Sequence, residues 1–304
     1  MAARTKAPRR LDLKGLLARR TLVVAPGAYD ALSARMVAAH GFPAIYLTGY
    51  GTTASLLGRP DIGFITLPDL CGVVRAICQS VEVPVIADAE SGFGNAVNLT
   101  RTVQEYEMAG ASAIHLEDQV VPKRYGGQET PQVVPAEEHA ARIRLAVKSR
   151  KSDRFLIIGR TDCLPRLGLA EAIRRGNQYR TAGADVVFVH GISTPEELRA
   201  VGKEVPGPKL VNYSALTLSS QDAPPSFADL RRWGYSIVIL AIEPLFAAAR
   251  AANGALASLA ECAREGGSPA QALRRLMMPR EEFEAFLAPR DYRGLEDAYL
   301  PREP

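Results

Sequence analysis

Residues 98–118 read "NLTRTVQEYEMAGASAIHLED" and join an amphipathic segment to an apolar one. Its first part is amphipathic and closes on Met-Ala-Gly-Ala, with a glycine suited to end a helix. Its second part, residues 113–118, is an almost continuously apolar run, as parallel strands require when both faces of their sheet are covered. The stretch therefore predicts a helix that ends at a glycine and leads directly into a buried strand.

The same helix–glycine–strand step recurs in "VAAHGFPAIYL" (37–47) and in "GLAEAIRRGNQYRTAGA" (168–184). Eight strand–helix units without a long linker predict an α/β fold, a single (β/α)8 TIM-type barrel. An open doubly wound sheet would normally offer a glycine-rich phosphate turn, and "ESGFGNA" lacks the G-x-G-x-x-G spacing. The expected strands cover residues 22–26, 44–49, 84–89, 113–118, 155–162, 186–191, 209–214 and 237–242.

The composition, with 47% hydrophobic and 23% charged residues, is that of a soluble globular protein. No apolar stretch approaches the roughly 18 residues of a membrane span and no signal peptide is visible, so we expect a cytoplasmic protein with reduced thiols. We expect a basic N-terminal tail or helix in residues 1–20, the barrel in 21–258 and a helical extension in 259–304. The basic segment shows no nucleic-acid-binding pattern, and we interpret it as a solvated tail.

Polar residues gather where the expected strands end, which is the end of a barrel that carries reactive groups. Four carboxylates follow the third and fourth strands and would repel one another if unpaired: Asp88, Glu90, Glu117 and Asp118. Either salt bridges to Arg160 and Lys123 or a bound divalent cation would offset this repulsion. We predict a metal, and oxygen ligands without a nearby His or Cys pair favour Mg²⁺ or Mn²⁺ over Zn²⁺. By contrast, Asp30 and Asp69 stand at helix starts and are interpreted as caps.

A basic loop punctuated by Pro and Gly, "VVPKRYGGQETPQ" (120–132), follows the fourth strand. Loops that close over a substrate exclude water and bring a last functional group into place. Because Lys123 and Arg124 lie in this segment, we predict a gate that closes over a small anionic carboxylate substrate.

Several segments together resemble a known family. "YLTGYGTTASLLGRPDIG", "PVIADAESGFGNAVN", "HLEDQVVPKRYGG", "IIGRTD" and "LVNY" are similar, in this order, to motifs of the isocitrate lyase/phosphoenolpyruvate mutase superfamily. The resemblance implies a (β/α)8 barrel whose last helix is exchanged between subunits, in dimers that pair into tetramers. It also implies Mg²⁺ and a 2-oxo or 2-hydroxy acid substrate that reacts through an enolate-like pyruvoyl species.

The resemblance assigns roles to individual residues. Asp88 would hold the metal directly or through water, Glu90 and Glu117 would complete its shell through waters, and Asp61 would lie nearby. Arg160 would pair with a carboxylate, a task that suits its planar fork, and Lys123 belongs to the mobile gate. In the family, backbone N–H groups of the loop that here contains Thr48, Gly49 and Tyr50 cradle the substrate carboxylate.

The chain also departs from the family pattern. Its gate reads Lys-Arg-Tyr-Gly-Gly, so Tyr125 replaces the cysteine that acts in proton transfer in the lyases, and Gly127 replaces a histidine. The metal motif reads Asp-Ala-Glu where the family usually shows Asp-x-Asp. His190, at the end of the sixth expected strand, resembles the phosphonate-cleaving members, whereas Asn212 resembles the lyases.

Decarboxylation of a 2-oxo dicarboxylate such as oxaloacetate, or a related C–C cleavage, makes the fewest demands on these residues. Tyr125 or water would supply the proton, and we predict catalytic roles for Lys123, Tyr125, Arg160 and His190. Two alternatives stay open. One is P–C chemistry like that of phosphoenolpyruvate mutase and phosphonopyruvate hydrolase, and the other is a barrel that binds a ligand without catalysis.

Overall fold

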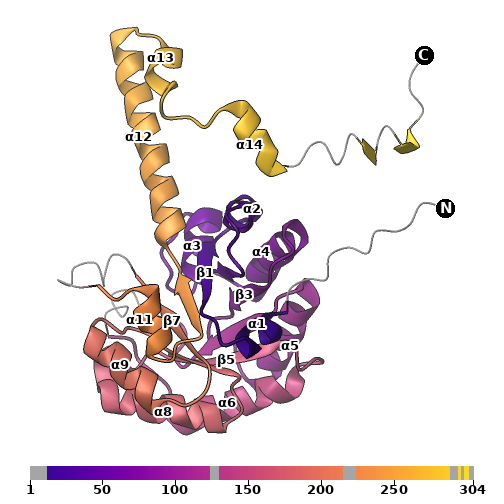
Figure 1. The fold of residues 1–304 in the computed structure, drawn as a ribbon, viewed down its shortest axis with the longest axis vertical. Helices are drawn as coiled ribbons and strands as arrows, with labels where there is room; N and C mark the ends of the chain where they lie inside the picture. The colour runs from indigo at the N-terminus through magenta and orange to yellow at the C-terminus, as the bar shows by residue number, and fades with distance from the viewer. Residues whose placement is uncertain (1–11, 124–129, 215–223, 288–293, 296–297, 301–304) are drawn as a thin grey trace. The chain divides into compact units, whose positions relative to one another are not determined.

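Eight parallel strands close into a barrel in the computed structural model of the protein, which describes residues 12–123, 130–214, 224–287, 294–295 and 298–300 (Figure 1). Each strand pairs with the next in sequence, and β8 pairs with β1. The predicted (β/α)8 barrel is therefore confirmed. The strands are β1 (Val23–Ala28), β2 (Ile45–Leu47), β3 (Val85–Asp88), β4 (Ala113–Glu117), β5 (Leu156–Thr161), β6 (Val186–Val189), β7 (Lys209–Asn212) and β8 (Ile237–Leu240).

Helices connect successive strands around the outside of the barrel (Figure 1). The carboxylate of Asp30 accepts the N–H of Ser33 and caps its helix, as predicted. Asp69 is instead the third helical residue, and its side chain accepts the N–H of the capping residue Thr66. The helices are α1 (Leu13–Ala18), α2 (Ala31–Ala39), α3 (Gly49–Thr52), the π-helix η1 (Thr53–Leu57), α4 (Leu67–Ser80), α5 (Ala96–Ala109), α6 (Ala136–Ser149), α7 (Leu164–Leu167), α8 (Leu169–Thr181), α9 (Pro195–Glu204) and α11 (Phe227–Arg232).

The barrel interior is filled by side chains. Tyr46, Ile158 and Phe188 belong to one buried apolar cluster that is contributed by all eight strands. Helix α1 adds Leu13 and Leu16 to this cluster, and Leu13 is fully buried. The solvated tail expected for residues 1–20 therefore does not extend through α1, because the apolar residues among its charges are held in the core.

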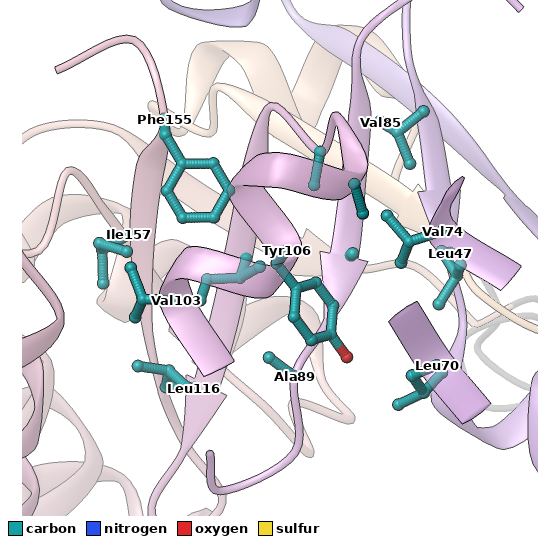
Figure 2. Packing of buried hydrophobic residues seen from close by; sticks show 14 of the residues in the cluster. Leu47, Leu70, Val74, Val85, Ala89, Val103, Tyr106, Leu116, Phe155 and Ile157 are labelled. Carbon is teal, nitrogen blue, oxygen red and sulfur yellow. The ribbon is translucent and has the colours of Figure 1, made fainter. Parts of the chain in front are cut away.

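A second core lies between the strands and their covering helices. Figure 2 shows part of it: Leu70 and Val74 of α4 lie near Leu47 of β2, and Val103 of α5 lies near Leu116 and Ile157. Full burial of one large apolar side chain is worth about 1.5–3 kcal/mol. This packing fixes the ends of β2, β3 and β4, from which the polar loops emerge.

The chain after Pro244 forms a second compact unit, Leu245–Pro304. It takes in α12 (Glu243–Glu265) except for the first two residues of that helix, together with α13 (Pro269–Leu273) and α14 (Arg280–Leu287). The expected boundary between residues 258 and 259 falls inside α12, so the helical extension begins earlier than the sequence indicated. None of the side chains of α12 is buried in the single chain. Within the described ranges, no helix is both long and apolar enough to cross a bilayer.

Candidate active site

Charged residues stand at the carboxyl ends of three neighbouring strands. Asp88 ends β3, Glu117 ends β4, and Arg160 is next to last in β5. Their exposed fractions are 5, 0 and 8%. Because parallel barrel strands all end on one face, these side chains meet at the mouth, where Nη1 of Arg160 lies 3.3 Å from Oε2 of Glu117.

The turn after β3 adds a third carboxylate, Glu90. Its φ of 51° costs a non-glycine residue about 1–3 kcal/mol, and such strain is concentrated at functional sites. The N–H of Glu90 donates to Oδ1 of Asp88 at 2.9 Å. The hydroxyl of Tyr106, visible in Figure 2, donates to the Asp88 carbonyl at 2.7 Å. These bonds hold the turn in place, and the Glu90 carboxylate stays buried beside Asp88.

The loop after β2 approaches the acids with its backbone. Gly49 donates its N–H to Oδ2 of Asp88 at 3.3 Å. A Cβ at this position would lie 2.6 Å from Asp88 Oδ2 and 2.9 Å from Glu90 Oε1, so only glycine fits. Thr48 caps α3 from the preceding position, and Tyr50 follows with its side chain partly exposed. The predicted carboxylate cradle therefore lies directly beside the predicted metal ligands.

Lys123 places a cation among the acids. Its Nζ lies 2.6 Å from Oε2 of Glu90, 3.2 Å from Oε1 of Glu117 and 3.4 Å from Oδ1 of Asp61. Only 9% of the Lys123 side chain is exposed. Together with Arg160, it forms the salt bridges that were one of the two expected solutions for the clustered acids.

Burial shapes the pKa values of these acids. It raises the pKa of Glu117 to about 7, with Lys123 acting in the opposite direction. It also raises the pKa of Glu90, again against Lys123, while Asp88 and Glu117 add to the rise. Burial also acts to raise the pKa of Asp88, but neighbouring groups, first His115 and then Arg160 and Lys123, outweigh it and lower the pKa of that carboxyl. Near neutral pH the cluster can therefore take up either protons or a further cation.

The donor set fits Mg²⁺ or Mn²⁺. Oε1 of Glu90 and both carboxylate oxygens of Glu117 are buried, and none of them has a hydrogen-bond partner among the described residues. The ion contacts of Glu117 are to Lys123 at 3.2 Å and to Arg160 at 3.3 Å. In that same part of the chain, no three His, Cys, Asp or Glu side chains converge closely enough to hold a metal alone. Mg²⁺ keeps several waters and takes one or two protein carboxylates. Asp88 would therefore hold a hydrated ion, with Glu90 and Glu117 reaching it through water.

Asp118, the fourth acid expected at the mouth, faces another direction. Its Oδ2 accepts from the hydroxyls of Tyr179 at 2.6 Å and Thr161 at 2.7 Å, and from Nη1 of Arg175 at 2.9 Å. Tyr179 and Arg175 belong to α8, outside the barrel. The prediction was wrong for this residue because consecutive residues of an extended chain point to opposite faces, so Glu117 and Asp118 do not both face inward.

Asp162, which the sequence did not single out as a site residue, binds Arg160. Its carboxylate accepts from Nε of Arg160 at 3.0 Å and from Nη2 at 2.8 Å. Oδ1 of Asp162 also lies 3.0 Å from Nδ1 of His190, whose side chain is 36% exposed. The fork of Arg160 is thus already engaged, whereas the sequence assigned it to a substrate carboxylate. The i, i+2 spacing of Arg160 and Asp162, which puts both on one face of an extended chain, could have found this pair.

His115 and Tyr46 form a buried polar layer beneath the acids, which the sequence reading also missed. Nε2 of His115 lies 2.7 Å from the Tyr46 hydroxyl and 3.7 Å from Oδ1 of Asp88. Burial lowers the pKa of His115 to about 4, so the ring is neutral at neutral pH. The signal was present in "AIHLED", where His115 alternates with Glu117 on the inward face of β4.

The structure describes one of the last two predicted site residues, Asn212, and not the other, Tyr125. Asn212 ends β7, and its Oδ1 is buried without a hydrogen-bond partner within the described ranges. Tyr125, together with Arg124 and Gly127, lies outside the described residues. The role of Tyr125 as a proton donor therefore stays a prediction from sequence.

The chain is similar to known proteins over most of its length. Residues 13–260 match the family described as phosphoenolpyruvate phosphomutase. The chain is 41% identical to 2,3-dimethylmalate lyase of Eubacterium barkeri over 239 residues, which cover 79% of this chain and 82% of the relative. It is 34% identical to an oxaloacetate decarboxylase of Rhodopseudomonas palustris (strain BisB5) over 269 residues, covering 86 and 87%. A solved structure of phosphonopyruvate hydrolase with oxalate and Mg²⁺ matches with a TM-score of 0.82 and 32% identity, covering 97% of this chain and 100% of that one.

These matches extend over most of both chains, so they concern the barrel and its mouth together. They agree with the motif order read from the sequence and with the closed barrel found in the structure. The chain belongs to the isocitrate lyase/phosphoenolpyruvate mutase superfamily, and the enzymes to which it is similar include some that are named as lyases.

Proposed function

We propose that the protein is a Mg²⁺-dependent lyase that cleaves a C–C bond of a small 2-oxo or 2-hydroxy dicarboxylate, with oxaloacetate decarboxylation as the first candidate. The proposal rests on one observation: at the barrel mouth, beside the buried Asp88, the buried carboxylates of Glu90 and Glu117 contact two cations, Lys123 and Arg160. Clustered, buried carboxylates can bind a metal ion, and the side chains of Lys123 and Arg160 can bind an anionic substrate. The names of the relatives, 2,3-dimethylmalate lyase and oxaloacetate decarboxylase, support the dicarboxylate class.

The two ends of a dicarboxylate would find different partners here. The resemblance to the superfamily assigns one carboxylate to the backbone of the Thr48–Tyr50 loop, where the N–H of Gly49, which donates to Asp88 in this structure, would have to change partner. Lys123 suits the other as a point charge, and Nη1 of Arg160 is the part of that guanidinium not bonded to Asp162. Binding at both ends would hold the substrate so that its scissile C–C bond lies next to Asp88, Glu90 and Glu117.

Cleavage beside a 2-oxo group leaves an electron pair on the substrate. When bound, Mg²⁺ would supply Lewis-acid chemistry by withdrawing electrons from that oxo group. In oxaloacetate the C–C bond breaks, CO₂ departs, and the remaining enolate takes up one proton to give pyruvate. Tyr125 or water is the predicted donor of that proton, and His190, partly exposed at the mouth, can deliver one from Nε2 only after Nε2 has taken one up.

A substrate panel followed by ¹H NMR tests the proposal. The purified protein with Mg²⁺ is given oxaloacetate, 2,3-dimethylmalate or phosphonopyruvate, and pyruvate and inorganic phosphate are measured. Reactions without protein are subtracted, because divalent ions alone decarboxylate oxaloacetate. We expect pyruvate from oxaloacetate, its loss in excess EDTA, and its loss in Asp88→Ala at unchanged circular dichroism.

Other outcomes would assign the protein differently. Release of phosphate from phosphonopyruvate would place it in the P–C class, which the end-of-strand His190 and the likeness to phosphonopyruvate hydrolase favour. Turnover of 2,3-dimethylmalate alone would keep the lyase class and move the substrate to a 2-hydroxy acid. If the panel compounds raise the Tm of the protein but none of them is turned over, the protein is a barrel that binds a ligand without catalysis.

We also propose a homo-oligomer, a dimer or a tetramer of two dimers, in which residues from α12 onward are exchanged between subunits. The resemblance to the superfamily supports this, and so does the exposure of large apolar side chains along α12. Phe246 and Leu256 are 39 and 65% exposed in the single chain. Large apolar side chains that are exposed together on a helix are typical of interaction surfaces.

A further inference from the structure

Asp162 contacts two residues to which the proposed function gives chemical roles. Its Oδ2 accepts from Nε of Arg160, and its Oδ1 accepts from Nη2 of Arg160 and lies 3.0 Å from Nδ1 of His190. The residue is only 1% exposed. One buried carboxylate therefore touches a guanidinium and an imidazole that come from neighbouring strands, β5 and β6.

The contact determines which nitrogen of His190 carries the proton. An ionised carboxylate only accepts hydrogen bonds, so Nδ1 of His190 must be the donor. In the neutral ring this leaves Nε2 unprotonated and able to take a proton, because each neutral imidazole has a single N–H. The same carboxylate holds two of the three guanidinium nitrogens of Arg160, and Arg160 packs over the Phe188 ring at 5.3 Å. The third, Nη1, faces Glu117.

The position of Asp162 is itself fixed by a hydrogen bond of its backbone to Asp118. The N–H of Asp162 donates to Oδ1 of Asp118 at 2.9 Å. Asp118 is anchored to the outer layer by Arg175 and Tyr179 of α8, at 2.9 and 2.6 Å. Because its backbone is hydrogen-bonded to this buried network, Asp162 has little freedom to move away from Arg160 and His190.

We propose that Asp162 is a positioning residue that sets the tautomer of His190 and the orientation of Arg160 at the same time. The proposal deepens the proposed function, on which it rests for the roles of these two residues. It predicts that His190 is held as the Nδ1–H tautomer, with Nε2 directed to proton transfer, and that this depends on Asp162.

The tautomer is tested directly by ¹⁵N NMR of histidine-labelled protein, at a pH where the exposed ring is neutral. The chain has 4 histidines, which keeps the spectrum simple, and His190→Gln assigns the signal that disappears. We expect wild-type His190 to show Nδ1 protonated and Nε2 unprotonated. In Asp162→Ala the ring should return to the mixture seen for histidine in water, in which Nε2–H prevails. Asp153→Ala, at an exposed aspartate, is the matched control and should leave the signal unchanged.

Kinetics supply the second readout. Asp162→Ala should lower kcat by roughly 10²-fold or more, within the range seen when a general acid–base loses its orientation. Since the two residues act as one unit, adding Asp162→Ala to His190→Gln should cost much less in kcat than the same change in the wild type. Full additivity of the two changes would overturn the proposal.

The two readouts separate this proposal from the proposed function. Wild-type His190 in the Nε2–H form overturns the positioning role whatever the protein catalyses, and this result does not depend on the folding of an Asp162 variant. The Nδ1–H form in a protein that turns over none of the panel acids would support the role of Asp162 and refute the proposed reaction instead.

Discussion

Nζ of Lys123 lies 2.6 Å from Oε2 of Glu90, and the two side chains are only 9 and 6% exposed. The same ammonium also contacts Glu117 and Asp61. Burial acts to lower the pKa of Lys123, but these acids outweigh it and raise that pKa well above its usual value. Lys123 is thus a charged, buried counter-ion to the acids that would serve a metal.

It follows that Lys123 and a divalent cation compete for the same carboxylates. Removing the ammonium in Lys123→Met should tighten Mn²⁺ binding by roughly tenfold or more, a gain of about 1.4 kcal/mol, because repulsion between the two cations is lost. Calorimetric titration at pH 8, where protons compete less for Glu117, measures the affinity. Lys203→Met, at an exposed lysine of α9, is the control. Weaker Mn²⁺ binding in the Lys123 variant would show that the lysine supports the metal site.

Gly49 offers a steric test of the site that leaves its charges intact. A Cβ there would lie within 2.9 Å of both Asp88 and Glu90 carboxylate oxygens, so Gly49→Ala should displace the acids. Because misplacement of reacting groups by about 1 Å can cost roughly 10²-fold in rate, we expect a loss of that order in kcat/KM.

Gly72 in α4 provides the matched control, since nothing lies within 4 Å of a Cβ built there. Gly72→Ala should keep full activity and raise stability by about 0.5–1 kcal/mol, because alanine is the better helix former. Equal activity of the Gly49 and Gly72 variants would contradict the placement of the β2 loop beside the acids.

The barrel could be read from the sequence because its strands are short, apolar on both faces and separated by helices, and because a glycine between helix and strand recurs along the chain. That chain order also predicted the mouth, since the carboxyl ends of parallel strands all lie on one face. Asp88, Glu90 and Glu117 were found in this way.

Other features depend on geometry that local patterns do not contain. The position of Lys123 among the acids is set by the path of a loop, and the shared role of Asp162 by side-chain angles on two strands. The outward turn of Asp118 follows from the strand alternation but also requires Arg175 and Tyr179 on a distant helix. Leu13 and Leu16 are buried although they lie in a strongly basic segment, because charge content does not reveal which apolar side chains find a core.

The exposed apolar residues of α12 predict self-association. Light scattering should give a mass that is a multiple of the 32.8 kDa chain, a dimer or a tetramer. The double change Phe246→Glu and Leu256→Glu should shift the population to smaller species, since it places charge on an apolar surface. A wild-type mass of one chain at working concentrations would refute the assembly.

His139 predicts how stability depends on pH. It is fully buried, its Nε2 lies 3.1 Å from the Leu116 carbonyl, and its ring packs edge-on against Tyr179. Burial lowers its pKa from 6.5 to about 4 in the folded protein. Because the unfolded chain takes up the proton first, this group's contribution to stability is complete above pH 6.5 and is lost as the pH falls from there to about 4.

Between pH 7 and pH 5 the loss from His139 should be about 2 kcal/mol, and His115 should act in the same sense because burial also lowers its pKa to about 4. Urea unfolding at the two pH values measures the difference for the wild type and for His139→Gln, whose amide can still donate to the Leu116 carbonyl. The variant should be less sensitive to acid by about 2 kcal/mol, whatever its stability at pH 7. His40→Gln, at an exposed histidine, should retain the full sensitivity of the wild type. An equal loss in the wild type and in His139→Gln would mean that His139 can accept its proton without unfolding the barrel.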